Sequence, residues 1–164
     1  MSYHPTIQSE ARRVDNLGPN APEDQLRALY FAILSSWFPV SRGYLIGRQS
    51  LIPQGKPEFI VVRPAGDFRN PVFVMKLKRP SKWGETGRDE VMHQLTQYIK
   101  DRFDFTQYET IYGLAGIGLH WMVCRVQKSG ERQHSLVLDW QDNVASDASY
   151  ASFRAIADHV HNIV

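Results

Sequence analysis

Two stretches determine the expected fold of this chain: Pro57-Glu58-Phe59-Ile60-Val61-Val62 and, fourteen residues further on, Lys76-Leu77-Lys78-Arg79-Pro80. β-Branched and aromatic residues dominate Phe59–Val62 and the run that leads into Lys76, which predicts two neighbouring strands. Turn-forming residues at 66–71 separate them, and Pro80 ends the second strand. The lysines therefore stand at the end of a strand whose other residues are apolar.

The elements on either side of these strands complete the pattern. A helix is predicted from Pro22 to Phe38, because apolar residues recur on one face and Asn20 to Asp24 resembles a helix start. A capping box of Thr86 and Asp89 predicts a second helix that ends near Phe103. Further strands are predicted at 44–51, 110–117, 119–126 and 134–140, and a last helix is predicted after a Ser146 cap. Strands clustered between helices indicate an α+β fold with a mixed central sheet flanked by α-helices.

Composition restricts the class of protein. The 164 residues are 43% hydrophobic and 22% charged, which is typical of one globular domain. A formal net charge of +2 does not by itself indicate a polyanionic partner. With a single cysteine, no apolar signal segment and no run long enough to span a membrane, we expect an intracellular protein of the cytoplasm or nucleus with no membrane partner.

Two lysines share one face of the predicted strand. Alternation places Lys76 and Lys78 on the face opposite Leu77, with their backbones only about 7 Å apart. Burying two ammonium groups is costly unless anions neutralise them, and the candidates are Glu58, Glu90 or a bound phosphate. The alternative is an edge strand, where outward lysines prevent pairing with other chains.

In its order of elements and its motifs the sequence resembles the PD-(D/E)XK, or restriction-endonuclease-like, nuclease superfamily. The resemblance covers roughly residues 22–126 and rests on the Pro57-Glu58 strand, the Lys78-Arg79-Pro80 strand end and a following helix that carries Gln94. More narrowly, the sequence is similar to nuclease-like domains of uncharacterised fungal proteins. We expect a flexible N-terminal segment at 1–20 and a single nuclease-like domain at 21–164.

The resemblance also implies roles for individual residues. Glu58 stands where the family has its first metal-binding carboxylate, and Lys78 where it has the lysine that orients the attacking water. Lys76 departs from the pattern, because the family has a second carboxylate at this position and lysine cannot ligate Mg²⁺. Some members carry that carboxylate on the next helix, where Glu90 follows Lys78 by twelve residues and Gln94 lies one turn further on.

Two functions follow, and the sequence leaves both open. In the first, the domain is catalytically degenerate and serves as a nucleic-acid-binding or protein-interaction module, with a protein partner or a homodimer as further options. In the second, Glu58, Glu90 and Glu23 hold Mg²⁺ or Mn²⁺, and the domain is an active nuclease that hydrolyses phosphodiesters. For Glu90 the alternative is a favourable interaction with the N-terminal end of its helix dipole.

A cluster of cations surrounds the lysine-bearing strand end. Its members are Lys76, Lys78, Arg79, Lys82 and Arg88, and Trp83 stands among them. Cations interleaved with an aromatic residue are typical of a groove that binds the phosphate backbone of DNA or RNA and stacks on its bases. The alternative is a solvated charged loop, which would bind no nucleic acid.

Overall fold

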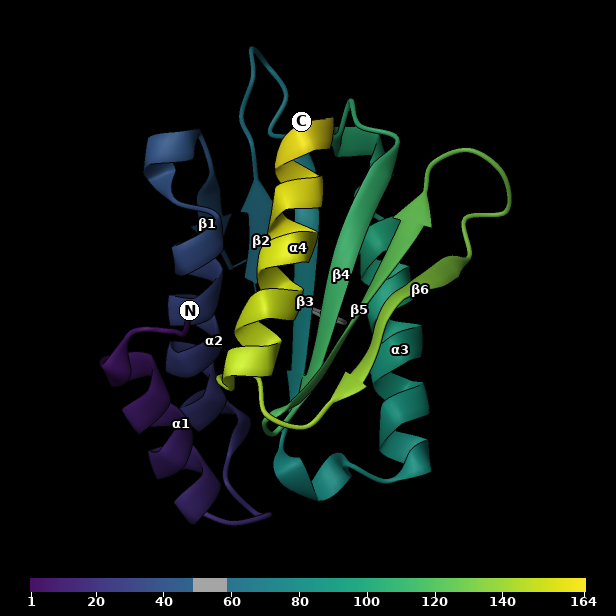
Figure 1. Ribbon diagram of the computed structural model, residues 1–164. Helices are drawn as coiled ribbons and strands as arrows, with labels where there is room; N and C mark the ends of the chain where they lie inside the picture. The colour runs from purple at the N-terminus through teal and green to yellow at the C-terminus, as the bar shows by residue number, and fades with distance from the viewer. Residues whose placement is uncertain (49–58) are drawn as a thin grey trace.

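The computed structural model describes residues 1–48 and 59–164, and in these the chain forms a six-stranded sheet with helices on both faces (Figure 1). The strands are β1 (Leu45–Gly47), β2 (Phe59–Val62), β3 (Pro71–Lys78), β4 (Thr110–Ile117), β5 (His120–Gln127) and β6 (His134–Gln141). The α-helices are α1 (Pro5–Asn16), α2 (Glu23–Trp37), α3 (Glu85–Lys100) and α4 (Asp147–Ile163). Three short 3₁₀ helices connect them: η1 (Val40–Arg42), η2 (Pro80–Lys82) and η3 (Phe103–Phe105).

Strand order in the sheet follows the sequence, β1 to β6. The first three strands are antiparallel neighbours, β3 and β4 are parallel, and β4 to β6 are again antiparallel. Parallel neighbours need a crossover connection, and α3 supplies it. This is the α+β arrangement with a mixed, helix-flanked sheet that the sequence predicts.

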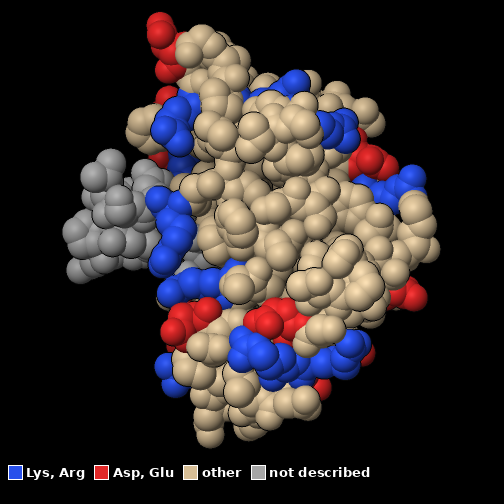
Figure 2. Space-filling view, turned by 90° about the vertical axis from the view of Figure 1, so that its left-hand side faces the viewer, with Lys and Arg blue, Asp and Glu red and all other residues tan. Residues whose placement is uncertain are grey.

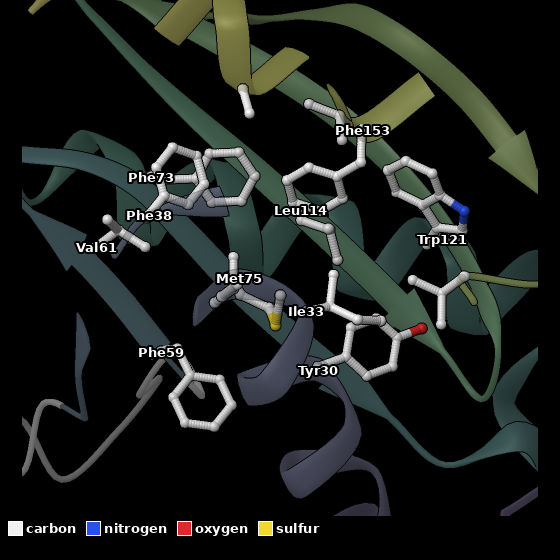
Figure 3. Close-up of a cluster of buried hydrophobic side chains, with 14 of the residues drawn as sticks. Tyr30, Ile33, Phe38, Phe59, Val61, Phe73, Met75, Leu114, Trp121 and Phe153 are labelled. Atoms are coloured by element: carbon white, nitrogen blue, oxygen red, sulfur yellow. The ribbon is translucent and has the colours of Figure 1, made fainter. Parts of the chain in front are cut away.

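The helices divide the core between the two faces of the sheet. Helices α1, α2 and α4 cover one face, where Phe73, Met75 and Leu114 join aromatic side chains such as Phe38 and Phe153 (Figures 1 and 3). Helix α3 covers the other face through Val91, Leu95 and Ile99, which pack with Val74 and Ala115 among others. The alternation of β3 therefore sends its two sets of side chains to different helices.

A buried tryptophan anchors α4 to the sheet. The Trp121 ring stacks on Phe153 with centroids 5.4 Å apart, and its Nε1–H donates a 2.9 Å hydrogen bond to Ser149 Oγ. Ser146 caps the helix by accepting from the Ser149 backbone N–H, as predicted. Together these contacts hold the start of α4 against β5.

Three details of the helices differ from the sequence analysis. The segment 1–20 was expected to be flexible, but it contains α1, whose Ile7, Ala11 and Val14 are buried in the core. An isolated twelve-residue helix is marginal, and packing against α2 and α4 accounts for its presence. The predicted capping box is wrong, because α3 begins at Glu85 after Gly84 with no side-chain cap. Helix α2 likewise begins after Pro22 with no side-chain cap, although Glu23 and Asp24 occupy its first turn.

Several predicted elements reach into residues 49–58, which lie outside the described part of the chain. These are the end of the predicted strand 44–51 and Glu58 at the start of the next. No helix among the described residues combines the length and apolar character needed to cross a membrane.

Candidate nucleic-acid interface at the end of strand β3

The lysine-bearing end of β3 lies inside the sheet. β3 pairs with β2 as far as Met75 and with β4 as far as Lys78, so β3 is not an edge strand of the described sheet. The positions that would lie beside Lys76 and Lys78 on the β2 side fall outside the described residues. In the parallel ladder Lys76 lies opposite Ala115, and Lys78 lies opposite Ile117. Both lysines are half-buried on the α3 face, whereas Leu77 between them is fully buried on the other face. The predicted sharing of one face by the two lysines is therefore correct.

Helix α3 brings an acidic side chain to this strand end. Lys78 Nζ lies 3.4 Å from Glu90 Oε2, and the two side chains are 12% and 52% exposed. An ion pair of this geometry is weak when one partner is half in solvent. It nevertheless places Glu90 directly beside Lys78, so the interaction of Glu90 is not confined to the dipole of its own helix.

Gln94 lies one turn further along α3, on the side of Glu90. Its side chain is half-buried, and its Oε1 is buried with no hydrogen-bond partner in the described part of the chain. A buried acceptor left without a donor costs roughly 1–3 kcal/mol. Among the described residues of this site, the same holds for one other buried side-chain atom, Nδ1 of His120 on β5.

The described residues do not form a metal site by themselves. Residues 1–48 and 59–164 contain no group of three or more His, Cys, Asp or Glu side chains placed to hold a metal ion. Glu90 offers one carboxylate and Gln94 one amide oxygen, whereas Lys76 offers no ligand. Glu23 is the first residue of α2, which packs on the opposite face of the sheet, and Glu58 lies outside the described residues.

A stack of aromatic rings lies beside η2. The Trp83 ring stacks on His120 with centroids 3.7 Å apart and an interplanar angle of 12°, and Trp140 contacts it edge-on. The Arg88 guanidinium lies over the indole, 4.9 Å from its centroid. The indole of Trp83 thus already contacts the imidazole of His120 and the guanidinium of Arg88. A nucleobase that stacked on Trp83 would have to compete with these two groups.

The sequence did not indicate that His120 belongs to this site, because a histidine within a predicted strand was expected only to pack against its neighbours. His120 lies opposite Ile117 in the β4–β5 ladder, and Ile117 lies opposite Lys78, so the three form one row across the strand ends. Asp142 lies 3.8 Å from its Nδ1. Burial lowers the pKa of His120 and outweighs the opposing effect of Asp142. The signal in the sequence was the turn at Gly118, which sets His120 beside the end of β3.

Two glycines allow the backbone segments of the site to approach closely. A Cβ built on Gly87 would lie 1.8 Å from the carbonyl oxygen of Lys82, so no larger residue fits there without movement of the backbone. Gly118 has a φ of +60° in the β4–β5 turn, and its N–H donates to the Lys78 carbonyl. These contacts fix η2 and the β4–β5 turn next to Lys78.

The remaining predicted cations lie further out. Arg79 precedes η2 and Lys82 is its last residue. Both side chains are exposed, as expected of a solvated loop. Arg88 is half-buried in the first part of α3. The face that carries α1, α2 and β1 shows Lys and Arg in small groups with Asp and Glu among them, rather than one continuous basic surface (Figure 2). This face therefore offers no extended basic surface.

Comparison with known proteins gives one structural likeness. No protein-family model matches the chain, and no curated protein sequence matches it. A crystal structure of the type IIG restriction endonuclease BpuSI matches 98% of the chain at 14% sequence identity, with a TM-score of 0.42. The chain spans 16% of the length of that protein. A likeness of this size carries no functional argument, and the similarity to fungal nuclease-like domains stays a prediction.

Proposed function

We propose that the chain binds the phosphate backbone of nucleic acid at the end of β3 and does not cleave it. The observation that supports this most is Lys76, which stands two residues before Lys78 on the same half-buried face of a central strand. A cation there repels a divalent metal and attracts a phosphate. Of the two functions that the sequence left open, the catalytically degenerate binding module is thus the better supported.

The local charge balance favours an anionic ligand. Residues 76–90 carry five cations against the three carboxylates Glu85, Asp89 and Glu90. Of these, Glu90 contacts Lys78 and is half in solvent, so a phosphate can replace it without breaking a strong ion pair. Phosphate groups bind such lysines through charge-assisted hydrogen bonds, with release of counterions.

Fluorescence anisotropy tests this proposal. Labelled single-stranded and duplex DNA and RNA of equal length are titrated with the protein in EDTA at increasing salt. The proposal expects binding that weakens steeply and linearly on a log–log salt plot. An absence of binding at low salt to all four substrates would contradict it and would leave the protein-interaction hypothesis.

A metal-dependent nuclease is the second candidate, because α3 does place Glu90 beside Lys78. In that case Glu58 and Glu90 would supply oxygen ligands to Mg²⁺ or Mn²⁺, which would provide Lewis-acid activation. Glu23 is left out of this set, because its helix packs on the opposite face of the sheet. Plasmid and single-stranded substrates incubated with Mg²⁺, Mn²⁺ or EDTA distinguish the candidates. Metal-dependent cleavage that is lost in both Glu58→Ala and Glu90→Ala would establish the nuclease and overturn the degenerate assignment.

A further inference from the structure

We propose that Arg42 and Arg63 form a binding site for a dianionic phosphate group, at the end of the sheet opposite the lysines of β3. Arg42 is the last residue of η1, Arg63 directly follows β2, and His161 stands in the last turn of α4. The C-terminal end of α4 and the connection between β2 and β3 lie at one end of the sheet, whereas the arrow of β3 points to the other (Figure 1). The site is therefore separate from the candidate nucleic-acid interface.

The backbone at Gly43 allows Arg63 to lie next to η1. Gly43 caps η1 with a φ of +90°, a conformation that favours glycine, and a Cβ built on it would lie 3.5 Å from the Arg63 Nε. The Arg63 guanidinium also lies over the ring of Tyr44, 5.7 Å from its centroid. Such a contact orients a guanidinium without neutralising its charge. Arg63 is thus held against the two residues that follow Arg42 in the chain.

A hydrogen bond between two ring side chains supports the arginines. Tyr44 is buried, and its hydroxyl lies 2.7 Å from Nδ1 of His161, while Phe38 contacts both rings edge-on. Burial raises the pKa of Tyr44 and lowers that of His161, so both groups are uncharged at neutral pH. The positive charges of Arg42 and Arg63 lower the pKa of both groups, as nearby cations do. Both guanidiniums therefore lie close to one uncharged pair.

The positive charge of the two arginines has no partner in the part of the chain that the structure describes. No carboxylate there forms an ion pair with Arg42 or Arg63. Asp158 lies one turn before His161 on α4, but it is exposed, and its effect on the imidazole is smaller than that of Arg42. Two guanidiniums match the two charges of a phosphate dianion and bind it through paired N–H donors, whereas a carboxylate carries one charge. Inorganic phosphate or a phosphate monoester is therefore the ligand that fits.

A purely structural role for the arginines is the alternative. Cations are favourable near the C-terminal end of a helix, where the dipole is negative, and α4 ends at this site. In that role Arg42 and Arg63 would stabilise the fold without any ligand. A test must therefore measure phosphate binding itself, and not only stability.

Isothermal titration calorimetry with inorganic phosphate provides this test. At about pH 8 and low ionic strength phosphate is mostly a dianion. We expect saturable binding, which Arg42→Gln/Arg63→Gln weakens by at least about tenfold. The control is Arg12→Gln/Arg154→Gln, which removes the same charge from exposed positions on α1 and α4 and should bind like the wild type. Circular dichroism checks that each variant is folded.

A pH titration of the histidine side chains by NMR gives a readout that needs no variant in the site. A bound dianion favours the protonated imidazole. Phosphate should therefore raise the pKa of His161 relative to chloride at equal ionic strength, and should leave the exposed His159 of the same helix unchanged. Arginines that served only the end of α4 would produce no such difference.

Further titrations separate this site from the end of β3 and identify the source of the phosphate. Lys76→Ala/Lys78→Ala should retain phosphate binding, whether or not the chain binds nucleic acid. Competition by glycerol phosphate would assign the site to small monoesters, and competition confined to a dinucleotide with a terminal phosphate would assign it to a nucleic-acid end. An absence of phosphate binding would overturn the inference. So would binding that is lost in Lys76→Ala/Lys78→Ala, or that Arg42→Gln/Arg63→Gln leaves unchanged.

Discussion

Lys78 of β3 and Glu90 of α3 are joined by a 3.4 Å contact between ammonium and carboxylate, although twelve residues separate them in the chain. The contact ties the strand end to the helix that crosses over to β4. A phosphate that binds Lys78 must therefore either displace the Glu90 carboxylate or share the Lys78 ammonium with it. The strength of this pair therefore sets part of the affinity for an anionic ligand.

Glu90→Gln should strengthen nucleic-acid binding. Removal of the competing carboxylate leaves Lys78 available, and the value of a half-exposed ion pair corresponds to roughly a two- to fivefold lower Kd. Anisotropy titration in EDTA measures it. Asp89→Asn is the control, because it removes the same charge from the exposed neighbouring residue of the helix. Equal tightening in both variants would show that only net charge matters and that the contact is irrelevant.

Gly87→Ala should destabilise the fold, since its Cβ would lie 1.8 Å from the Lys82 carbonyl oxygen. Overpacking typically costs about 1–3 kcal/mol, and a contact with backbone is harder to relieve than one with a side chain. Gly84→Ala is the control, because nothing lies within 4 Å of its Cβ, and it should cost no more than about 0.5 kcal/mol. Urea unfolding measures both; equal stabilities would contradict the packing described for η2 and α3.

Stability should fall as the solution becomes acidic. Burial lowers the pKa of His161, whose Nδ1 lies 2.7 Å from the Tyr44 hydroxyl. The imidazole of His161 therefore binds a proton at a higher pH in the unfolded chain than in the folded chain. Its contribution to the free energy of unfolding is present above the ordinary pKa of 6.5 and is lost as the pH falls below that value. His120 acts in the same direction.

Urea midpoints measured between neutral and mildly acidic pH test this dependence. His161→Gln should flatten it in part, whereas His159→Gln, at an exposed position on the same helix, should leave it as in the wild type. A steeper loss of stability in His161→Gln than in the wild type would contradict the assigned direction.

The sequence predicted the arrangement of elements well, because local patterns determined it. Patterns of apolar, β-branched and turn residues correctly placed the strands β3, β4 and β5 along the chain. The helix α1 was missed because its apolar residues are few and become buried only through packing on α2 and α4. Tertiary contact, and not helix propensity, accounts for it.

The site was predicted less completely than the fold. Glu90 was one of three candidate anions for the two lysines, and its carboxylate lies 3.4 Å from the Lys78 ammonium. The stack of Trp83 on His120 joins residues 37 positions apart on η2 and β5, and no local pattern encodes it. The metal pair of Glu58 and Glu90 stays a prediction, because Glu58 lies outside the described residues.

The phosphate site at the end of β3 is tested by the salt dependence of nucleic-acid binding in Lys76→Ala/Lys78→Ala. The control, Lys100→Ala/Arg154→Ala, removes two positive charges from the far end of α3 and from α4. We expect the first variant to bind more weakly and to lower the slope of log K against log salt by about 1 for each lysine that contacts a phosphate, while the control changes little. Equal affinities and slopes in the two variants would contradict a phosphate site at the end of β3.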